Sequence, residues 1–325
     1  MSQKSNFWVN YLNIEQFLSE VGKTQFFYYI IEPKIKEGKE FNLLDAFKQI
    51  NEEKQANNTH YVSIEDYRVC IVLGEEILKE KEEYYIFGKF IASEGSKWYR
   101  EELDGDLSEL ELSEERSRLC SLRKGALLFL LYINNNTNKN VLMFEDISFS
   151  LGIGGLRKYF NNKYSDILES FVTKQKWGKD LKPVLRNIGN SGLKMAHLKI
   201  RRNIQQDQLK YKGVIEKAAP LLLQPDIECE LTLRFKKDNK TLKQFLTEIF
   251  QTEDITDIFD MELSEVFKNL DFELNNTAEP KFSFFDKVFK FELPFNKFEK
   301  VDEKTIFSTM LNHFQDNKTN ILEQE

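Results

Sequence analysis

The segment ALLFLLYINNNTNKNVLMFED, residues 126–146, decides the fold class that this sequence predicts. Two apolar runs, 126–133 and 140–146, lie on either side of the polar stretch NNNTNK. Each run has the length of a β-strand, and asparagine and other short polar residues accept the backbone angles of tight turns. The segment therefore predicts an antiparallel β-hairpin in the middle of the chain.

Strands and helices are predicted on both sides of this hairpin. Apolar runs and alternating patterns indicate strands at residues 25–32, 67–73, 84–92, 193–203, 228–236 and 281–293. Apolar residues at helical spacing indicate helices at residues 14–21, 42–51, 241–250 and 254–270. The turn SLGIGG (150–155) is expected to lead into a helix that runs to Phe171, and roughly the last dozen residues are expected to fray.

The order of these elements predicts an α+β fold. Strands and helices alternate without the strict repeat that would enforce a parallel sheet, so we expect mixed or mainly antiparallel sheets flanked by helices. Within strand 84–92, Gly88 predicts a β-bulge. We expect two domains. The first, at 1–218, is a mixed α+β domain with an acidic connector at 101–118 and a basic segment at 171–213, and the second, at 219–325, is a smaller α+β domain.

The composition is typical of a folded cytoplasmic protein. Hydrophobic residues make up 41% of the 325 residues, which is enough to bury a sizeable core. The N-terminus lacks the apolar core of a signal peptide, and no run of about 18 apolar residues predicts a membrane span. Cys70, Cys120 and Cys229 are far apart in apolar contexts, which predicts buried thiols in a reducing compartment.

Positive charge is concentrated in the basic segment 171–213, although the chain carries a net charge of −7. The segment holds eleven Lys and Arg against two Asp, a local charge of +9, which leaves −16 for the rest of the chain. Such a separation can build a strong field over one face. The competing interpretation is that half of these cations pair with the acidic segments 101–115 and 253–273 of the same chain.

Cations, aromatic rings and amides are interleaved in the basic segment, which suits a nucleic-acid ligand. Lys and Arg neutralise phosphates, and aromatic faces stack on bases. The first hypothesis is therefore a protein that binds RNA or single-stranded DNA, with its oligomeric state left open. Its expected phosphate contacts are Lys194, Lys199, Arg201, Arg202, Lys210 and Lys212, and its expected stacking residues are Trp177 and Tyr211.

Two other functions remain open from the sequence. The acidic segments suit a module that occupies the basic groove of another protein, as a nucleic-acid mimic does. A metal-dependent nuclease is the second alternative, because carboxylates and a lysine follow one another loosely as in PD…ExK nucleases, although the ExK step itself is absent. The candidates for that site are Asp226, Glu228, Glu230 and Lys236.

Catalytic and cofactor motifs are missing from the sequence. SLGIGG fits neither GxGxxG nor GxxxxGK[ST], and neither a GxSxG nucleophile motif nor a CxxC pair occurs. His60, His197 and His313 lie far apart. We therefore expect no cofactor and no resident metal, and we name no catalytic residue.

The order of motifs over residues 122–203 resembles that of uncharacterised bacterial proteins. The motifs are a strand (KGALLFLLYI), a second strand (NVLMFED), the turn SLGIGG, a helix (LRKYF) and a later strand with basic residues (LKIRRN). Such proteins are often encoded on mobile elements or beside phage-defence genes. The resemblance covers about a quarter of the chain and implies a role in phage defence, but it assigns no functional residue.

Overall fold

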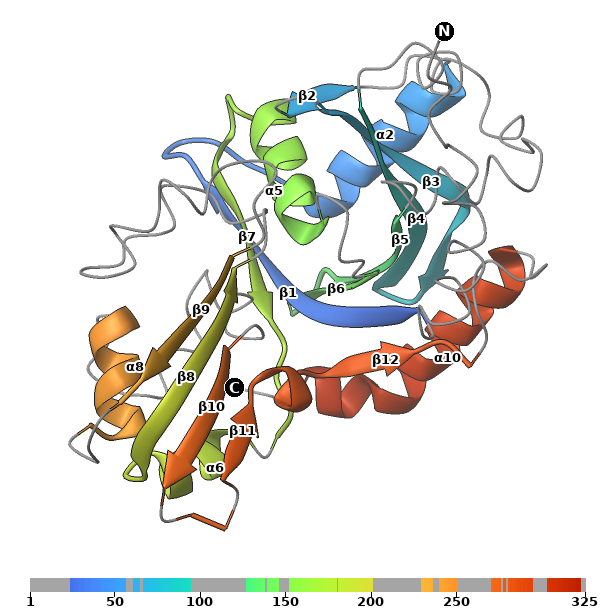
Figure 1. The fold of residues 1–325 in the computed structure, drawn as a ribbon. Helices are drawn as coiled ribbons and strands as arrows, with labels where there is room; N and C mark the ends of the chain where they lie inside the picture. Colours follow the sequence, from blue (N-terminus) through green and yellow to red (C-terminus); the bar gives the residue numbers. More distant parts are fainter. Residues whose placement is uncertain are drawn as a thin grey trace, which may run out of the picture.

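The computed structural model describes residues 24–56, 61–64, 67–94, 127–137, 139–145, 152–179, 181–200, 229–235, 240–250, 270–275, 277–278, 280–294 and 303–322. These residues form two sheets with helices packed on their faces (Figure 1). Every strand pair among them is antiparallel. The predicted α+β class is confirmed, and its sheets are antiparallel.

The larger sheet contains eight strands in the order β12-β1-β6-β5-β4-β3-β2, with β7 also paired to β1. Its strands are β1 (Gln25–Ile35), β2 (Val62–Ile64), β3 (Tyr67–Glu80), β4 (Glu83–Glu94), β5 (Leu127–Asn134), β6 (Lys139–Glu145), β7 (Leu168–Gln175) and β12 (Lys290–Glu292). The predicted hairpin is confirmed as β5 and β6. On the edge of β1 opposite β6, β12 pairs with the start of the strand and β7 with the remainder.

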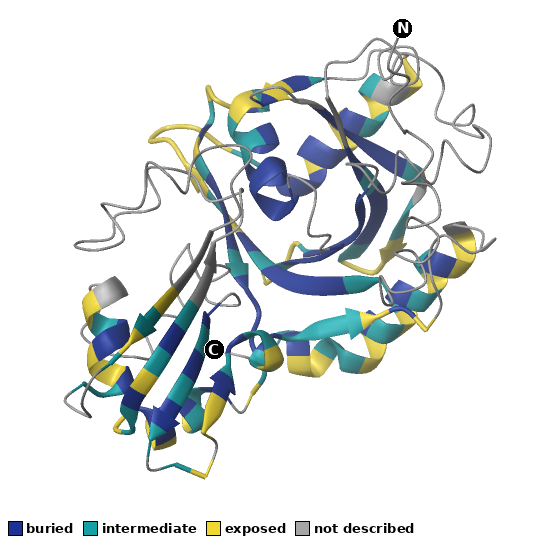
Figure 2. Ribbon diagram, in the orientation of Figure 1, coloured by how far each residue is buried: buried dark blue, intermediate teal, exposed yellow. Residues whose placement is uncertain are grey.

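Two helices fill the concave face of the larger sheet. The sheet curls around α2 (Leu43–Gln55) and α5 (Gly152–Lys163), as Figure 1 shows. Because side chains alternate along a strand, every second residue of β1 and β5 points to these helices. Phe47 of α2 contacts the rings of Phe129 and Phe160, with centroids 6.0 and 5.5 Å apart. The resulting core consists of buried hydrophobic side chains, and Figure 2 shows the strands and helices around it as mostly buried.

The last helix, α10 (Glu303–Leu322), covers the convex face of the same sheet. Ile306, Met310, Phe314 and Ile321 recur at helical spacing and are all buried against the strands. Figure 2 shows α10 with buried residues toward the sheet and exposed residues away from it. The prediction that the last dozen residues fray is therefore wrong for those up to Leu322, because this apolar stripe holds the helix on the sheet.

The smaller sheet has the strand order β11-β10-β8-β9. Its strands are β8 (Gly192–Ile200), β9 (Cys229–Arg234), β10 (Leu270–Asn275) and β11 (Lys281–Ser283). The helices α6 (Leu181–Ile188) and α8 (Leu242–Phe250) contribute buried leucines to the core that this sheet shares. A short 3-10 helix, η4 (Phe285–Lys287), separates β11 from β12, so the single strand predicted at 281–293 is two strands in different sheets.

Strand pairing crosses the predicted domain boundary at residue 218. In the smaller sheet, β8 pairs with β9 and β10, and in the larger sheet β1 pairs with β12. Residues before and after the boundary therefore share both sheets. The boundary itself, the acidic connector 101–118 and the predicted helix 14–21 lie outside the described residues.

The predicted helix from SLGIGG to Phe171 is shorter than expected. It ends at Lys163, and β7 begins at Leu168. Tyr164 follows the helix: its backbone N–H still donates to Phe160, and its hydroxyl donates to the Ala46 carbonyl of α2 at 3.2 Å. Pairing with β1, more than a hundred residues earlier, stabilises the following residues as a strand instead.

Gly88 lies opposite Leu73 in the last pair before a register shift, so the predicted irregularity borders this residue. The register shift falls in the partner strand, between Leu73 and Ile77. A Cβ atom on residue 88 would lie 2.4 Å from Cζ of Phe129. Glycine is required here because the Phe129 ring crosses directly over the backbone.

Candidate functional site

Of the predicted phosphate contacts, the structure places two on strand β8. Lys194 lies on β8, exposed, and forms an ion pair with Glu273 of β10 at 3.2 Å. Lys199 also lies on β8, opposite Glu230 of β9. The remaining predicted cations and tyrosine lie outside the described residues, as do three of the nuclease candidates; these are Arg201, Arg202, Lys210, Tyr211, Lys212, Asp226, Glu228 and Lys236.

Trp177 does not offer a stacking surface. Its side chain is only 6% exposed and packs edge-on against Phe284, with ring centroids 5.7 Å apart. Its backbone bridges to Val288 just before β12. The residue therefore anchors the connection between β7 and α6 in the core. Its buried ring cannot stack on a nucleic-acid base as the sequence predicted.

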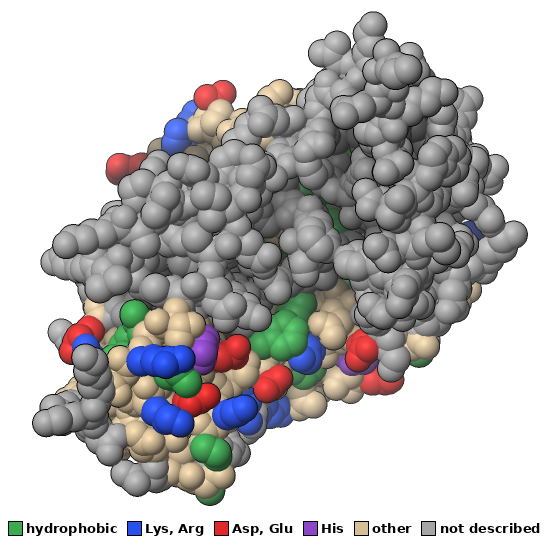
Figure 3. All heavy atoms as spheres, in the orientation of Figure 1, with side chains coloured by type: hydrophobic (Ala, Val, Ile, Leu, Met, Phe, Trp, Pro, Cys, Tyr) green, Lys and Arg blue, Asp and Glu red, His purple; other side chains and the backbone are tan. Residues whose placement is uncertain are grey.

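The outer face of the smaller sheet carries charges of both signs. Met195 lies between Arg234 and Glu273 of the neighbouring strands, and His197 lies between Thr232 and Asp271. Figure 3 shows positive and negative side chains next to one another over this sheet. On this face the competing interpretation from the sequence, internal pairing, fits better than separation of charge.

A second set of cations from the basic segment lies at the end of β7. Lys174 pairs with Ile30 of β1, and the backbone N–H of Lys176 donates to the Tyr28 carbonyl at 2.8 Å. Because side chains on paired strands share a face, both lysines lie on the face of Tyr28, which is the face that α10 covers. Their surroundings nevertheless differ sharply.

Lys174 has a carboxylate partner and Lys176 has none in the part of the chain that the structure describes. The Lys174 ammonium lies 2.6 Å from Glu32 Oε2. Lys176 is 4% exposed, and its ammonium makes no hydrogen bond or ion pair with a described residue. Burial, together with the smaller effect of the positive charges of Lys139, Lys179 and Lys182, lowers the pKa of Lys176 to about 8. We call these four residues, Lys139, Lys176, Lys179 and Lys182, the lysine cluster.

Three separate elements bring the lysine cluster together. Lys139 opens β6, and its ammonium donates to the Leu322 carbonyl at the C-terminal end of α10, 2.8 Å away. This contact agrees with the negative end of the helix dipole. Lys179 and Lys182 lie on either side of the start of α6. Gly178 fixes that start, because its N–H donates to Lys287 and its carbonyl accepts from Leu181.

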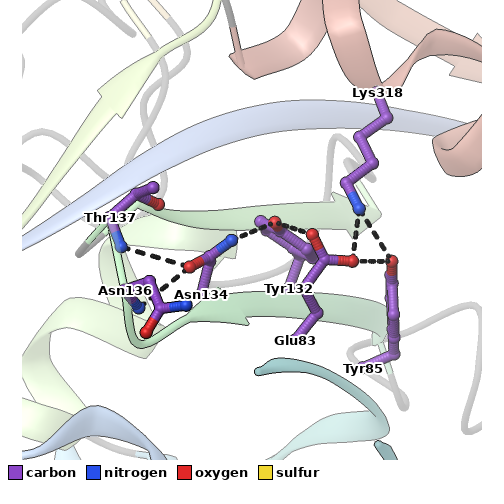
Figure 4. Close-up of polar contacts among 7 residues, drawn as sticks. All are labelled: Glu83, Tyr85, Tyr132, Asn134, Asn136, Thr137 and Lys318. Atoms are coloured by element: carbon purple, nitrogen blue, oxygen red, sulfur yellow. Dashed lines mark hydrogen bonds and ion pairs between the residues drawn. The ribbon is translucent and has the colours of Figure 1, made fainter. Parts of the chain in front are cut away.

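A neighbouring lysine of α10 shows how this chain satisfies a charge internally. Glu83 accepts hydrogen bonds from the hydroxyls of Tyr132 and Tyr85, at 3.0 and 3.1 Å, and from the Lys318 ammonium (Figure 4). Burial alone would raise the pKa of Glu83, but these three donors outweigh it and hold the pKa below its ordinary value. Asn134, at the end of β5, donates to the Tyr132 hydroxyl and extends the network. The network links α10 to the sheet and leaves Lys318 neutralised.

A second polar contact beneath α10 joins Tyr28 and His313. The Tyr28 hydroxyl lies 2.7 Å from Nδ1 of His313, whose ring stacks on Phe291 with centroids 4.1 Å apart. Burial lowers the pKa of His313, and only the charge of Asp316 opposes this. Neutral His313 therefore accepts a hydrogen bond from the Tyr28 hydroxyl near pH 7 and helps to hold the helix on the sheet.

Sequence reasoning identified the lysine cluster only in part. Lys176, Lys179 and Lys182 were counted in the basic segment but not chosen as contacts, although alternation along β7 separates Lys174 and Lys176 from the apolar face. No sequence signal joins Lys139 to them, because the contact depends on the sheet. Cys70 is buried, as predicted.

The described ranges contain no group of three His, Cys, Asp or Glu side chains placed to hold a metal ion. None of the helices in these described ranges is long and apolar enough to cross a membrane. No family model, curated protein or solved structure matches the chain.

Proposed function

We propose that this protein binds nucleic acid, either RNA or single-stranded DNA, through its phosphate groups, with the lysine cluster as the main contact. The observation that supports this proposal is the setting of Lys176. The Lys176 residue is 4% exposed, the charges of three other lysines act on it, and no carboxylate among the described residues does so. A site of this kind attracts an anion, because a bound phosphate offsets both the desolvation and the mutual repulsion.

The cluster suits recognition of the backbone more than of the bases. Lys139 and Lys179 are exposed and Lys182 is half-buried, so these three can contact phosphates that run along the surface. Trp177 is in the core and supplies no base stacking. We therefore expect binding that depends weakly on sequence and strongly on salt. The predicted contacts Lys199, Arg201, Arg202, Lys210, Tyr211 and Lys212 remain part of the proposal, whereas Lys194 contributes less because Glu273 neutralises it.

The first prediction concerns the two members of the cluster on either side of the start of α6. The double variant Lys179→Glu with Lys182→Glu should weaken binding to labelled RNA and single-stranded DNA at least tenfold, because two phosphate contacts become repulsive. Its slope of log affinity against log salt should become shallower by about 0.7 for each lost contact, over about 50 to 200 mM salt. Fluorescence anisotropy measures both quantities.

The matched control is Lys48→Glu, which changes charge on α2 at the concave face of the larger sheet. Its affinity should fall far less than that of the double variant. The proposal fails if the wild-type protein forms no complex with RNA, single-stranded DNA or duplex DNA at low salt. It also fails if the double variant binds as tightly as the wild-type protein.

We further propose a cytoplasmic role in bacterial phage defence, which rests on the resemblance of residues 122–203. Plaque counts on a host that expresses the protein, with the double variant as comparison, test this role. Equal plaque counts with the protein present and absent, over a broad panel of phages, would remove it.

A further inference from the structure

We infer that Lys176 is the binding site for a terminal phosphate group, so that the protein prefers nucleic acid ending in a phosphomonoester over the same chain ending in a hydroxyl group. This inference rests on the proposed nucleic-acid binding. It specifies which part of the ligand the buried lysine contacts, while the exposed lysines contact the internal backbone.

The first step is the cost of the unpaired charge. An ammonium removed from water is strongly destabilising unless an anion or hydrogen-bond acceptor compensates it. Lys176 is 4% exposed and has neither partner among residues that the structure describes. Lys139, Lys179 and Lys182 increase this cost rather than offset it. A ligand that carries negative charge would supply the missing partner.

The second step is the rigidity of the backbone at this position. The Lys176 N–H donates to the Tyr28 carbonyl at 2.8 Å, and its own carbonyl accepts from the Phe289 N–H at 3.0 Å. The next residue, Trp177, is buried and bridges to Val288. The main chain is therefore held on both sides and keeps Lys176 turned toward the α10 face. Only its four-carbon stem can adjust, which allows the ammonium to meet an anion that approaches it.

The third step concerns the kind of phosphate that can reach a buried ammonium. An internal phosphodiester carries a single charge and continues into a sugar on both sides, so it stays on the surface. A terminal phosphomonoester carries about −1.5 to −2 charges near pH 7, offers three acceptor oxygens and is attached through one ester bond. It can therefore extend to Lys176 while the following phosphates lie against Lys179 and Lys182.

The test compares oligonucleotides that differ only at one end. Single-stranded DNA and RNA of one sequence, with a 5′-phosphate, a 3′-phosphate or hydroxyls at both ends, compete with a labelled strand in anisotropy titrations. The wild-type protein should prefer one of the phosphorylated forms by about tenfold or more, the value expected for a charge-assisted contact. Lys176→Met should lose this preference and still bind the hydroxyl-ended strand.

The matched control is Lys174→Met. This lysine lies two residues earlier on the same face, but its charge is paired with Glu32. The variant should keep the end preference of the wild-type protein. Lys176→Gln provides a second variant of the buried residue in case methionine disturbs folding, and it should lose the preference as well.

The outcomes separate this inference from the proposed function. Equal affinity of the wild-type protein for all ends overturns the inference and leaves nucleic-acid binding standing. Absence of binding to every strand overturns the proposed function. In that case, inorganic phosphate still tests the Lys176 site, because it should raise the melting temperature of the wild-type protein and not of Lys176→Met at equal ionic strength. A preference that survives in both Lys176 variants also overturns the inference.

Discussion

At the residue scale, two lysines of the same strand show how the surroundings decide what a side chain does. Lys174 and Lys176 share one face of β7, yet Lys174 is neutralised by Glu32 and Lys176 is buried among other lysines. Net charge counts these residues as equal. Their difference arises from β1, where Glu32 lies within ion-pair distance of Lys174, whereas the backbone N–H of Lys176 bonds to Tyr28 and no carboxylate of β1 pairs with its ammonium.

This difference predicts that Lys176→Met stabilises the protein in the absence of ligand. The pKa of Lys176 is lowered from 10.5 to about 8, so the folded state carries the full penalty of the buried charge below pH 8. Between pH 8 and 10.5 the unfolded chain binds more protons, and the penalty fades as pH rises. The variant should therefore gain about 1 to 3 kcal/mol at pH 7 and less at pH 10.

Urea denaturation of both proteins at the two pH values measures this gain. Lys174→Met is again the control, and it should be neutral or slightly destabilising because it breaks a surface ion pair. A lower stability of Lys176→Met at pH 7 would mean that the chain itself supplies a counter-charge to Lys176.

At the element scale, the sequence predicted those strands and helices whose signal is local. Alternation and spacing were enough for the hairpin of β5 and β6, for β8 and β9, and for α2 and α8. Sequence reasoning missed β7, because its strand state depends on pairing with β1 far away in the chain. It also missed α10. The apolar residues of this twenty-residue helix are widely spaced, and they are buried only because the helix packs on the convex face of the sheet.

The contact between α10 and the sheet should weaken in acid. Burial holds the pKa of His313 below 6.5, so the folded state resists protonation of this ring. The contribution of the contact is present above pH 6.5 and is lost as pH falls through the lowered pKa, because a protonated Nδ1 no longer accepts the Tyr28 proton. His313→Gln should remove this step, which has a size of about 1 kcal/mol.

Hydrogen exchange of the α10 amides between pH 7.5 and about 5 tests this prediction. The facing groups that also titrate are Glu83, whose pKa is already low, and Tyr28, whose pKa burial raises far above this range. Neither contributes a step near pH 6. If wild-type α10 and the His313→Gln helix lose protection in parallel, the histidine is not responsible.

At the scale of the whole molecule, the candidate site is assembled from segments that the sequence keeps apart. Lys139 lies within the central hairpin at the start of β6, Lys176 to Lys182 follow β7, and Leu322 ends α10. The sequence identified the basic segment 171–213, but it could not show that Lys194 meets Glu273 on the smaller sheet (Figure 3) while Lys176 is buried with other lysines acting on its charge. The number of charged residues in a segment of sequence therefore suggests the class of ligand, but it does not show which of those residues form the binding surface.

The most direct test of the lysine cluster is lysine labelling with and without bound nucleic acid. Acetylation followed by mass spectrometry reports each lysine separately, so Lys48 and Lys174 serve as internal references. We predict that a 5′-phosphorylated single strand protects Lys139, Lys179 and Lys182 and slows the already slow labelling of Lys176. Unchanged labelling of all four lysines in a saturated complex would contradict the account.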